Sequence, residues 1–339
     1  MLPSDPPTGS SLPPAPPSLA VDPQGKNAVF RLGEKEVTLT HLDRIYFPES
    51  GLSKGDLVRY YLAISPYLIP HLRERPLTLE RWPEGLEDGS FYQKDASPYF
   101  PEWLKTFPVV RKDQKKTIHY PVVQDEADLL YLVNLGTITF HSQMSRITAY
   151  DQPDLMIVDI DPPESEPTPE PGGADFVFPE HTASASADES AQLTPLQLAA
   201  SVAVLVRDYL RGFALDPVVK TSGKRGVHMA FRLTGKLDFD SARAWLKDVF
   251  SQLAAQHPEL LTVEIRKEKR KGRVYLDALR MSRGATIVPP YVARATPEAT
   301  VSTPISWEEL ASLKHGRCFT IKTVPDRLAK TGDLWKALI

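Results

Sequence analysis

The chain has 339 residues, enough for two domains or for one large one. It carries 40 Lys and Arg against 43 Asp and Glu residues, and the resulting formal net charge of −3 argues, taken as a whole, against a polyanionic partner. The single cysteine, Cys318, excludes an intrachain disulfide and a cysteine-based zinc site. No apolar run approaches the ~20 residues that span a bilayer, so we expect a cytoplasmic protein with no membrane contact.

Two proline-rich segments distort this average charge. Residues 1–25 contain eight prolines and two acidic residues, residues 163–195 contain six prolines and seven acidic residues, and neither segment has a Lys or Arg. Such compositions bury too little apolar surface to offset the entropy of ordering, so we expect a disordered tail at 1–25 and a disordered acidic insertion at 163–195. The other 281 residues carry a net charge of +6. The segment 26–339, without its insertion, is therefore a basic domain.

Helical and strand patterns alternate along this domain. Ser53 and Asp56 have the spacing of a capping box, and apolar residues follow at helical spacing from Leu57 to Leu68. Thr194 and Pro195 predict the start of a helix that runs to about Arg211, and Asp240 predicts the cap of another helix. The predicted strands cover residues 155–161, 218–221, 227–233, 274–279 and 286–288. The pattern is that of an α/β or α+β enzyme.

Asp159 and Asp161 end the first of these strands, which begins as a run of four apolar residues. The period of two along a strand places both carboxylates on one face, where each raises the pKa of the other unless a cation lies between them. Mg²⁺ or Mn²⁺ prefers such a pair of oxygen ligands. The alternative is a strand-end turn in which the aspartates cap backbone amides.

The segment from Thr221 to His228 joins two predicted strands and contains two glycines. Glycine allows the backbone to approach a ligand closely, and the Ser222 hydroxyl with the Lys224 and Arg225 side chains could bind a triphosphate. His228, at the start of the next strand, could donate to a phosphate. The alternative is an ordinary charged turn of a β-hairpin.

A third carboxylate, Asp277, lies near the end of another predicted strand, after a basic run at 266–273. The run is either a solvated surface or a site for nucleic-acid phosphates beside a third metal ligand. Two close carboxylates, a third from another strand and a basic glycine-containing turn are together the residues that two-metal nucleotidyl transfer requires.

With these motifs the sequence resembles the polymerase domain of bacterial ATP-dependent DNA ligase D, a branch of the archaeo-eukaryotic primase superfamily. The resemblance runs from about Thr38 to Leu338 without the insertion. Its motifs are LDRIYFP (42–48), SKGD (53–56), RPLTLERWPEG (75–85), FYQK (91–94), DIDP (159–162), the turn at 221–228 and RGATIVPPY (283–291). The implied fold is α+β, an archaeo-eukaryotic primase-like catalytic core with mixed or antiparallel sheets flanked by helices.

The resemblance also implies roles for individual residues. Asp159, Asp161 and Asp277 would be the catalytic ligands of two Mn²⁺ or Mg²⁺ ions. The implied nucleotide-binding residues are His141, Ser222, Lys224, Arg225, His228, Arg270 and Arg294. Arg44 and Lys54 would grip a DNA 5′-phosphate, Phe91 and Tyr92 would stack on template bases, and Arg81 and Lys94 would make further phosphate contacts. Without the resemblance, His141 would be assigned as a core or surface histidine, and Phe91 and Tyr92 as ordinary core aromatics.

The chain departs from the family pattern at Gln143, Met281 and Val292, where we expect altered nucleotide selectivity or rate. The implied function is a template-dependent primase-polymerase that adds nucleotides, expected to be ribonucleotides, at DNA gaps or breaks bearing a 5′-phosphate, in non-homologous end joining or excision repair. We expect a nucleoid-associated bacterial monomer that uses NTP or dNTP substrates and works with a DNA ligase in trans and a Ku-type protein. The alternatives are a DNA-end-binding scaffold with little or no catalysis and a primase that initiates primers.

Overall fold

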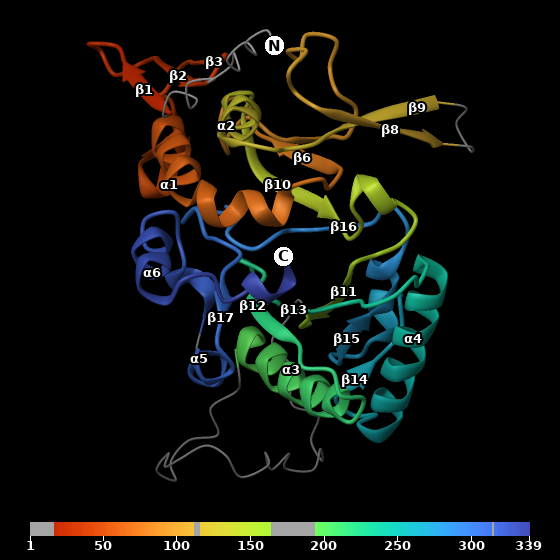
Figure 1. Ribbon diagram of the computed structural model, residues 1–339. Helices are drawn as coiled ribbons and strands as arrows, with labels where there is room; N and C mark the ends of the chain where they lie inside the picture. Colours follow the sequence, from red (N-terminus) through yellow and green to blue (C-terminus); the bar gives the residue numbers. More distant parts are fainter. Residues whose placement is uncertain (1–16, 112–115, 164–193, 314) are drawn as a thin grey trace, which may run out of the picture.

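The computed structural model of the chain describes residues 17–111, 116–163, 194–313 and 315–339 (Figure 1). These residues form an α+β fold in which helices flank mixed and antiparallel sheets around two large hydrophobic cores. In Figure 1 residues up to about 140, together with C-terminal residues between 288 and 328, build the upper core, while α3, α4 and the largest sheet build the lower one. Over the described ranges, none of the helices has both the length and the apolar character needed to cross a membrane.

The upper core surrounds two helices, α1 (Lys54–Leu72) and α2 (Glu126–Asn134). As predicted, α1 begins at a capping box, in which the Ser53 side chain accepts from the Asp56 amide and the Asp56 carboxylate accepts from the Ser53 amide. The upper strands are β1 (Ser18–Val21), β2 (Ala28–Leu32), β3 (Lys35–Leu39), β4 (Ile45–Phe47), β5 (Leu52–Ser53), β6 (Leu77–Arg81), β7 (Phe91–Gln93), β8 (Thr106–Arg111), β9 (Lys116–Pro121), β10 (Thr137–Gln143) and β16 (Thr286–Ile287). Of these, β16, β10, β6 and β7 form one four-stranded sheet.

Part of the segment expected to be a disordered tail forms a strand. Residues 18–21 form β1, which pairs with β2 in an antiparallel hairpin. The Asp22 carboxylate fixes the turn by accepting hydrogen bonds from the backbone amides of Lys26 and Asn27. The composition of the segment 1–25 as a whole hides the signal of this short strand and turn. Residues 1–16 lie outside the described residues.

The lower core is organised around a six-stranded sheet in the order β14-β15-β11-β13-β12-β17. Its strands are β14 (Leu261–Thr262), β15 (Val274–Asp277), β11 (Leu155–Asp161), β13 (Val227–Arg232), β12 (Val218–Thr221) and β17 (Pro304–Ile305). Neighbours are antiparallel except for the parallel pair β14 and β15. In Figure 1 the helix α3 (Pro195–Arg211) lies below the sheet, and α4 (Phe239–Gln256) lies along its right side.

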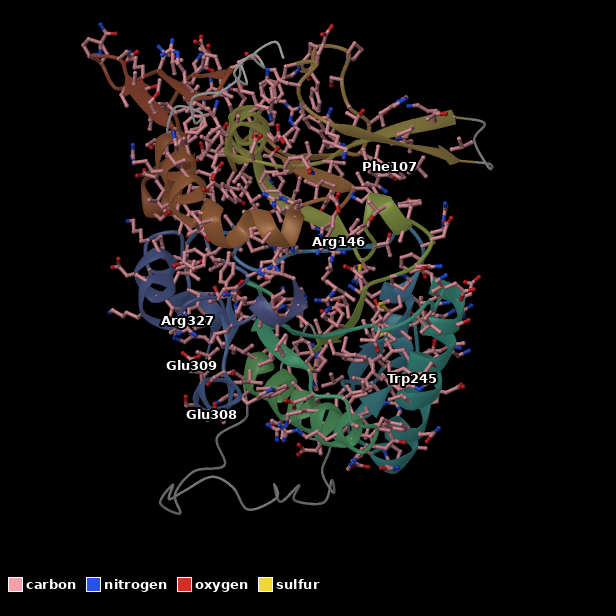
Figure 2. All side chains as sticks on the ribbon, in the orientation of Figure 1. Phe107, Arg146, Trp245, Glu308, Glu309 and Arg327 are labelled. Carbon is pink, nitrogen blue, oxygen red and sulfur yellow. The ribbon has the colours of Figure 1, made fainter. Side chains whose placement is uncertain are left out.

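Two short helices, α5 (Trp307–Ser312) and α6 (Val324–Thr331), follow the sheet. The Arg327 guanidinium on α6 donates to the Glu309 carboxylate on α5, with 2.6 Å between Nη2 and Oε2 (Figure 2). This ion pair links α5 to α6.

Most predicted boundaries in the lower core are confirmed, with three corrections. The strands at 155–161 and 218–221 and the helix that starts at Pro195 have the predicted bounds. The cap of α4 is Asp238, whose carboxylate accepts from the Ser241 amide at 2.8 Å, whereas Asp240 lies inside the first turn. The strand predicted at 274–279 ends at Asp277, where a 3-10 helix (Ala278–Met281) takes over.

The third correction concerns the acidic insertion. Residues 164–193 of it lie outside the described residues, while Thr194 and Pro195 already belong to α3 as its cap and first residue.

Candidate active site

A cleft of about 600 Å³ lies between the six-stranded sheet and the sheet that contains β10 and β16. It is lined by nine of the ten residues predicted to bind metal or nucleotide: His141, Asp159, Asp161, Ser222, Lys224, Arg225, His228, Arg270 and Arg294. The tenth, Asp277, lies on the neighbouring strand directly opposite Asp159. The fold therefore brings together side chains that are up to 153 positions apart, from His141 to Arg294.

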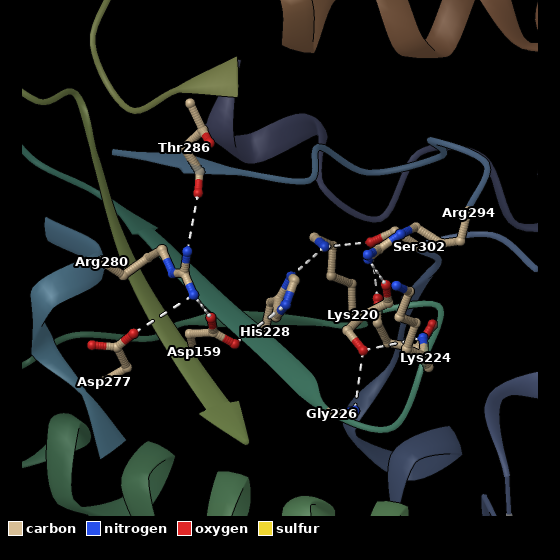
Figure 3. Close-up of polar contacts among 12 residues, drawn as sticks. Asp159, Lys220, Lys224, Gly226, His228, Asp277, Arg280, Thr286, Arg294 and Ser302 are labelled. Atoms are coloured by element: carbon tan, nitrogen blue, oxygen red, sulfur yellow. Dashed lines mark hydrogen bonds and ion pairs between the residues drawn. The ribbon is translucent and has the colours of Figure 1, made fainter. Parts of the chain in front are cut away.

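The register of the six-stranded sheet places four ionisable residues in one row. Asp159 on β11 is opposite Asp277 on β15 and opposite His228 on β13, and His228 is in turn opposite Lys220 on β12. Directly opposed residues of antiparallel strands point to the same face. The row Asp277–Asp159–His228–Lys220 therefore crosses the upper face of the sheet, with Asp161 two residues further along β11 (Figure 3).

The electrostatics of the carboxylates follow from this crowding. Burial, followed by repulsion from the Asp161 and Asp277 carboxylates, raises the pKa of Asp159 to about 7. Burial also raises the pKa of Asp161. Arg280 offsets part of the repulsion, because its Nη2 lies 2.9 Å from Asp159 Oδ2 and 3.6 Å from Asp277 Oδ2. This cluster of three carboxyl groups requires a neighbouring positive charge.

These carboxylates fit the divalent cations that the resemblance implies. Asp159 is 4% exposed, and its Oδ1 is a buried oxygen without a hydrogen-bond partner, at 3.4 Å from His228 Nε2. Within the described ranges, no three His, Cys, Asp or Glu side chains are already gathered tightly enough to enclose a metal ion. The Arg280 guanidinium instead supplies the positive charge between the strands. A cation could bind here if Arg280 yields part of its contact with the carboxylates.

The turn between β12 and β13 is rigid and closely packed. Ser222 Oγ accepts from the backbone amides of Lys224 and Gly226 at 3.2 and 3.1 Å. Arg294 Nη1 donates to the Ser222 carbonyl at 2.5 Å. Gly223 has φ +73°, and a Cβ there would lie 2.6 Å from Arg294 Cγ, so only glycine fits. Lys224 and Arg225 are exposed at the rim of the cleft.

His141 enters the cleft from β10, opposite the carboxylates. Its Nε2 lies 3.2 Å from Glu80 Oε2, and its ring packs edge-on against Tyr92, with 5.6 Å between the centroids. Burial lowers the pKa of His141, and the Glu80 carboxylate opposes that shift. Arg270 lies at the other side, with its guanidinium carbon 3.8 Å from the centroid of the Tyr275 ring.

The residues predicted to contact DNA lie in the upper half of the molecule. Lys54 is buried, its Nζ donates to Asn134 Oδ1 at 2.8 Å, and burial together with Arg44 lowers the pKa of Lys54 to about 8. Arg44 is half-buried and pairs with Glu84 at 2.6 Å. Two cations therefore lie side by side with incomplete compensation, which is a suitable place for an anion.

Strand β7 presents two exposed aromatic rings, Phe91 at 46% and Tyr92 at 61% exposure. Arg81 lies beneath them: it is buried, its guanidinium donates to the Leu135 carbonyl, and its carbon lies 5.1 Å from the Phe91 ring centroid. Arg81 thus supports the aromatic surface and is not itself presented to solvent. Lys94 is exposed and lines a second cleft beneath the β8–β9 hairpin.

Sequence reasoning missed three residues of the site: Glu80, Lys220 and Arg280. Glu80 lies within a quoted motif, but its partner His141 is on a different strand. Lys220 was detectable as a lone charge inside an apolar strand pattern. Arg280, three positions after Asp277, carries no signal that distinguishes it from a surface arginine.

The three departures from the family pattern lie away from the cleft lining. Met281 is fully buried in the lower core, where its Sδ accepts from the Ile157 amide at 3.3 Å. Val292 is fully buried in the upper core, and Gln143 is 1% exposed. The expectation that these residues alter nucleotide selectivity therefore has no direct contact to support it.

Paired carboxylates on the central strands of a mixed sheet, next to a basic glycine-containing turn, are the features expected of a nucleotidyltransferase of the primase-polymerase class. The sequence model of the family described as "LigD, primase-polymerase domain" matches residues 53–170 and 191–335. The chain belongs to this family.

Individual relatives agree with this assignment. The chain is 29% identical to the multifunctional non-homologous end joining protein LigD of Mycolicibacterium smegmatis and 28% identical to the bifunctional non-homologous end joining protein LigD of Bacillus subtilis, in each case over 88% of this chain. It spans only 36% and 43% of those relatives. The polymerase domain of Mycobacterium tuberculosis ligase D, solved in complex with DNA, superimposes with a TM-score of 0.77 at 27% identity, covering 90% of this chain and 98% of that one.

Proposed function

We propose that this protein adds nucleotides, preferentially ribonucleotides, to a 3′-hydroxyl at DNA gaps or breaks that carry a 5′-phosphate. The observation that carries the proposal is the placement of Asp159 and Asp161 in the same cleft as the turn at 222–228, with Asp277 directly opposite Asp159 on the neighbouring strand. Asp159, Asp161 and Asp277 would hold two divalent ions, Mn²⁺ or Mg²⁺, which when bound acidify the attacking hydroxyl and stabilise the pyrophosphate leaving group.

The protein's own residues bind and orient the triphosphate. Lys224 and Arg225 at the rim and Arg294 behind the turn supply positive charge. Gly223 lets the turn pack directly against Arg294 and the backbone of Val301 and Ser302. His228 points its Nε2 into the cleft beside Asp159. Arg280 neutralises the carboxylates and limits their repulsion in the free protein.

DNA would lie across the upper half of the molecule. Arg44 and Lys54 are proposed to hold the 5′-phosphate on the far side of the gap, and Phe91 and Tyr92 to stack on template bases. That the protein binds DNA at all is supported by the M. tuberculosis relative, which was solved in complex with DNA. The basic residues of the segment 266–273 border the cleft and would attract the phosphate backbone.

We place the reaction in the repair of DNA ends. The two LigD relatives are named for non-homologous end joining, and this chain spans the polymerase part of their length. A filled gap still needs its nick sealed, so the proposed partners are a DNA ligase in trans and a Ku-type end-binding protein.

Primer extension on a gapped duplex with a 5′-phosphate, in the presence of Mn²⁺, tests the proposal. We expect template-directed incorporation that prefers NTPs to dNTPs and that is abolished in the Asp159→Ala/Asp161→Ala double variant. A duplex with a 5′-hydroxyl is the matched control substrate and should be extended less. Absence of incorporation by the wild type, with tight DNA binding in both proteins, would instead indicate an end-binding scaffold.

A further inference from the structure

Lys220 is a fully buried lysine in the middle of strand β12, at the end of the polar row that crosses the sheet. Burying an ammonium group without partners is costly, so its surroundings must compensate it. Lys220 is not part of the cleft lining, and none of the roles proposed above uses it. We therefore ask which groups its amine contacts.

The Lys220 amine has two hydrogen-bond partners and lies over an aromatic ring. Its Nζ lies 2.7 Å from His228 Nδ1, 2.5 Å from Ser302 Oγ and 5.5 Å from the centroid of the Trp335 ring. The Ser302 hydroxyl donates its own hydrogen to the Thr221 carbonyl at 3.0 Å. Ser302 must therefore accept from Lys220, which makes Lys220 the donor in this group.

The two ring nitrogens of His228 face opposite chemical environments. Nδ1 faces the Lys220 amine, and Nε2 faces Asp159 Oδ1 at 3.4 Å and the open cleft. A carboxylate oxygen repels an unprotonated nitrogen and attracts an N–H, whereas an amine that donates to the ring requires an unprotonated nitrogen. These two contacts place the ring hydrogen of His228 on Nε2 and leave Nδ1 to accept from Lys220.

We propose that Lys220 is a positioning residue that fixes His228 as the Nε2–H tautomer, with that N–H directed into the cleft to donate to a triphosphate oxygen. Ser302 and Trp335 hold the Lys220 amine in place, and the Trp335 indole is itself fixed by donating to the Val219 carbonyl at 3.1 Å. The inference rests on the proposed nucleotide-binding role of the cleft. It adds a residue that touches neither substrate nor metal and acts through His228 alone.

The tautomer is measurable in the free protein by ¹⁵N spectroscopy of histidine-labelled chain, with the His228 signals assigned by a His228→Gln variant. We expect an N–H signal from Nε2 and an unprotonated, hydrogen-bonded signal from Nδ1. In Lys220→Met, which keeps most of the side-chain volume but has no donor, the Nδ1 signal should shift and the other tautomer should become populated. A hydrogen on Nδ1 in the wild type would overturn the proposal.

Binding of ATP with Mn²⁺, measured by calorimetry, gives the functional consequence. We expect about tenfold weaker binding in Lys220→Met, the effect of misdirecting one hydrogen bond to a charged group, and no change in Lys247→Met, whose lysine is exposed on α4. Unchanged affinity together with unchanged ring signals in folded Lys220→Met would contradict the proposal.

If Lys220→Met does not fold, the wild-type tautomer and a Ser302→Ala variant decide the matter. Ser302→Ala removes one acceptor of the amine and should shift the Nδ1 signal of His228, whereas an unchanged signal would count against the proposal. Because the tautomer is read without nucleotide, failure of the polymerase assay with an Nε2–H tautomer would overturn only the proposed function.

Discussion

Several buried ionisable residues in this protein contact specific polar neighbours. Arg280 contacts Asp159, Ser302 and His228 contact Lys220, and Glu80 contacts His141. Lys54 is buried close to the like charge of Arg44, and its Asn134 partner is neutral. A group of this kind is poised to gain from binding an anion.

The lowered pKa of Lys54 predicts a pH-dependent preference for 5′-phosphate ends. Burial and Arg44 place this pKa at about 8, so the ammonium is present at pH 7 and lost as the pH rises through 8 and, with phosphate bound, somewhat above it. We expect the ratio of affinities for 5′-phosphate over 5′-hydroxyl gapped DNA to fall about tenfold between pH 7 and 9.5, measured by fluorescence anisotropy. Lys54→Met should show a low, pH-independent ratio, and Lys330→Met, an exposed lysine on α6, should behave as the wild type. A ratio that stays constant with pH in the wild type would remove Lys54 from the 5′-phosphate site.

Met281 gives a second test at the scale of one residue. Its sulfur accepts the hydrogen bond of the Ile157 amide, within the strand that carries Asp159. Met281→Leu conserves volume but leaves that buried N–H without an acceptor, so we expect a loss of about 1–2 kcal/mol in the free energy of unfolding, measured by urea denaturation. The preference for NTP over dNTP should not change, because Met281 does not line the cleft. A changed preference at unchanged stability would show that this position does affect the nucleotide pocket.

At the scale of elements, strand β7 is the part of the upper sheet that presents aromatic rings to solvent. Phe91→Ala and Tyr92→Ala should each weaken binding to gapped DNA by roughly 1–3 kcal/mol, as expected for the loss of a base-stacking partner. Phe213→Ala is a matched control. Phe213 is 49% exposed, which is similar to Phe91, but it lies after α3 in the lower half of the molecule. Electrophoretic mobility shifts at fixed salt would measure the effect. Equal affinities for Phe91→Ala, Tyr92→Ala and Phe213→Ala would mean that β7 is not a template surface.

The elements also show how far the sequence alone can be interpreted. The strand at 155–161 and the helix from Pro195 were predictable because apolar periodicity and capping are local signals. The choice between Asp238 and Asp240 as the cap of α4 was not, because both are good capping residues and the backbone conformation decides. The roles of Lys220 and Arg280 depend on the order β15-β11-β13-β12, which pairs strands far apart in the sequence. No local pattern encodes that register, so the predicted site lacked the residues that neutralise and orient it.

At the scale of the whole molecule, a buried polar cluster joins the two hydrophobic cores. The Asp333 carboxylate accepts from the Tyr291 hydroxyl at 2.6 Å and from the Trp335 amide at 2.8 Å, and it lies 2.9 Å from His71 Nε2. His71 belongs to α1 and Tyr291 to the upper core, whereas Trp335 packs into the lower core and against the Lys220 amine. Burial alone would raise the pKa of Asp333, but the hydrogen bonds and the charge of His71 hold that pKa below its usual value. The Asp333 carboxylate therefore couples α1 to the sheet that carries the polar row Asp277–Asp159–His228–Lys220.

Removing this carboxylate should both destabilise the fold and disturb the active site. In Asp333→Ala the buried Tyr291 hydroxyl and Trp335 amide lose their acceptor, at ~1–3 kcal/mol each, so we expect a loss of about 2–6 kcal/mol in the free energy of unfolding. Because Trp335 also contacts Lys220, the His228 ring signals should shift in the same variant under native conditions. Urea denaturation followed by far-UV circular dichroism measures the first effect, and Asp326→Ala, an exposed acid on α6, is the control. A loss no larger than that of Asp326→Ala would mean that packing alone couples the two cores. Unchanged ring signals of His228 in folded Asp333→Ala would show that the polar row is held independently of this cluster.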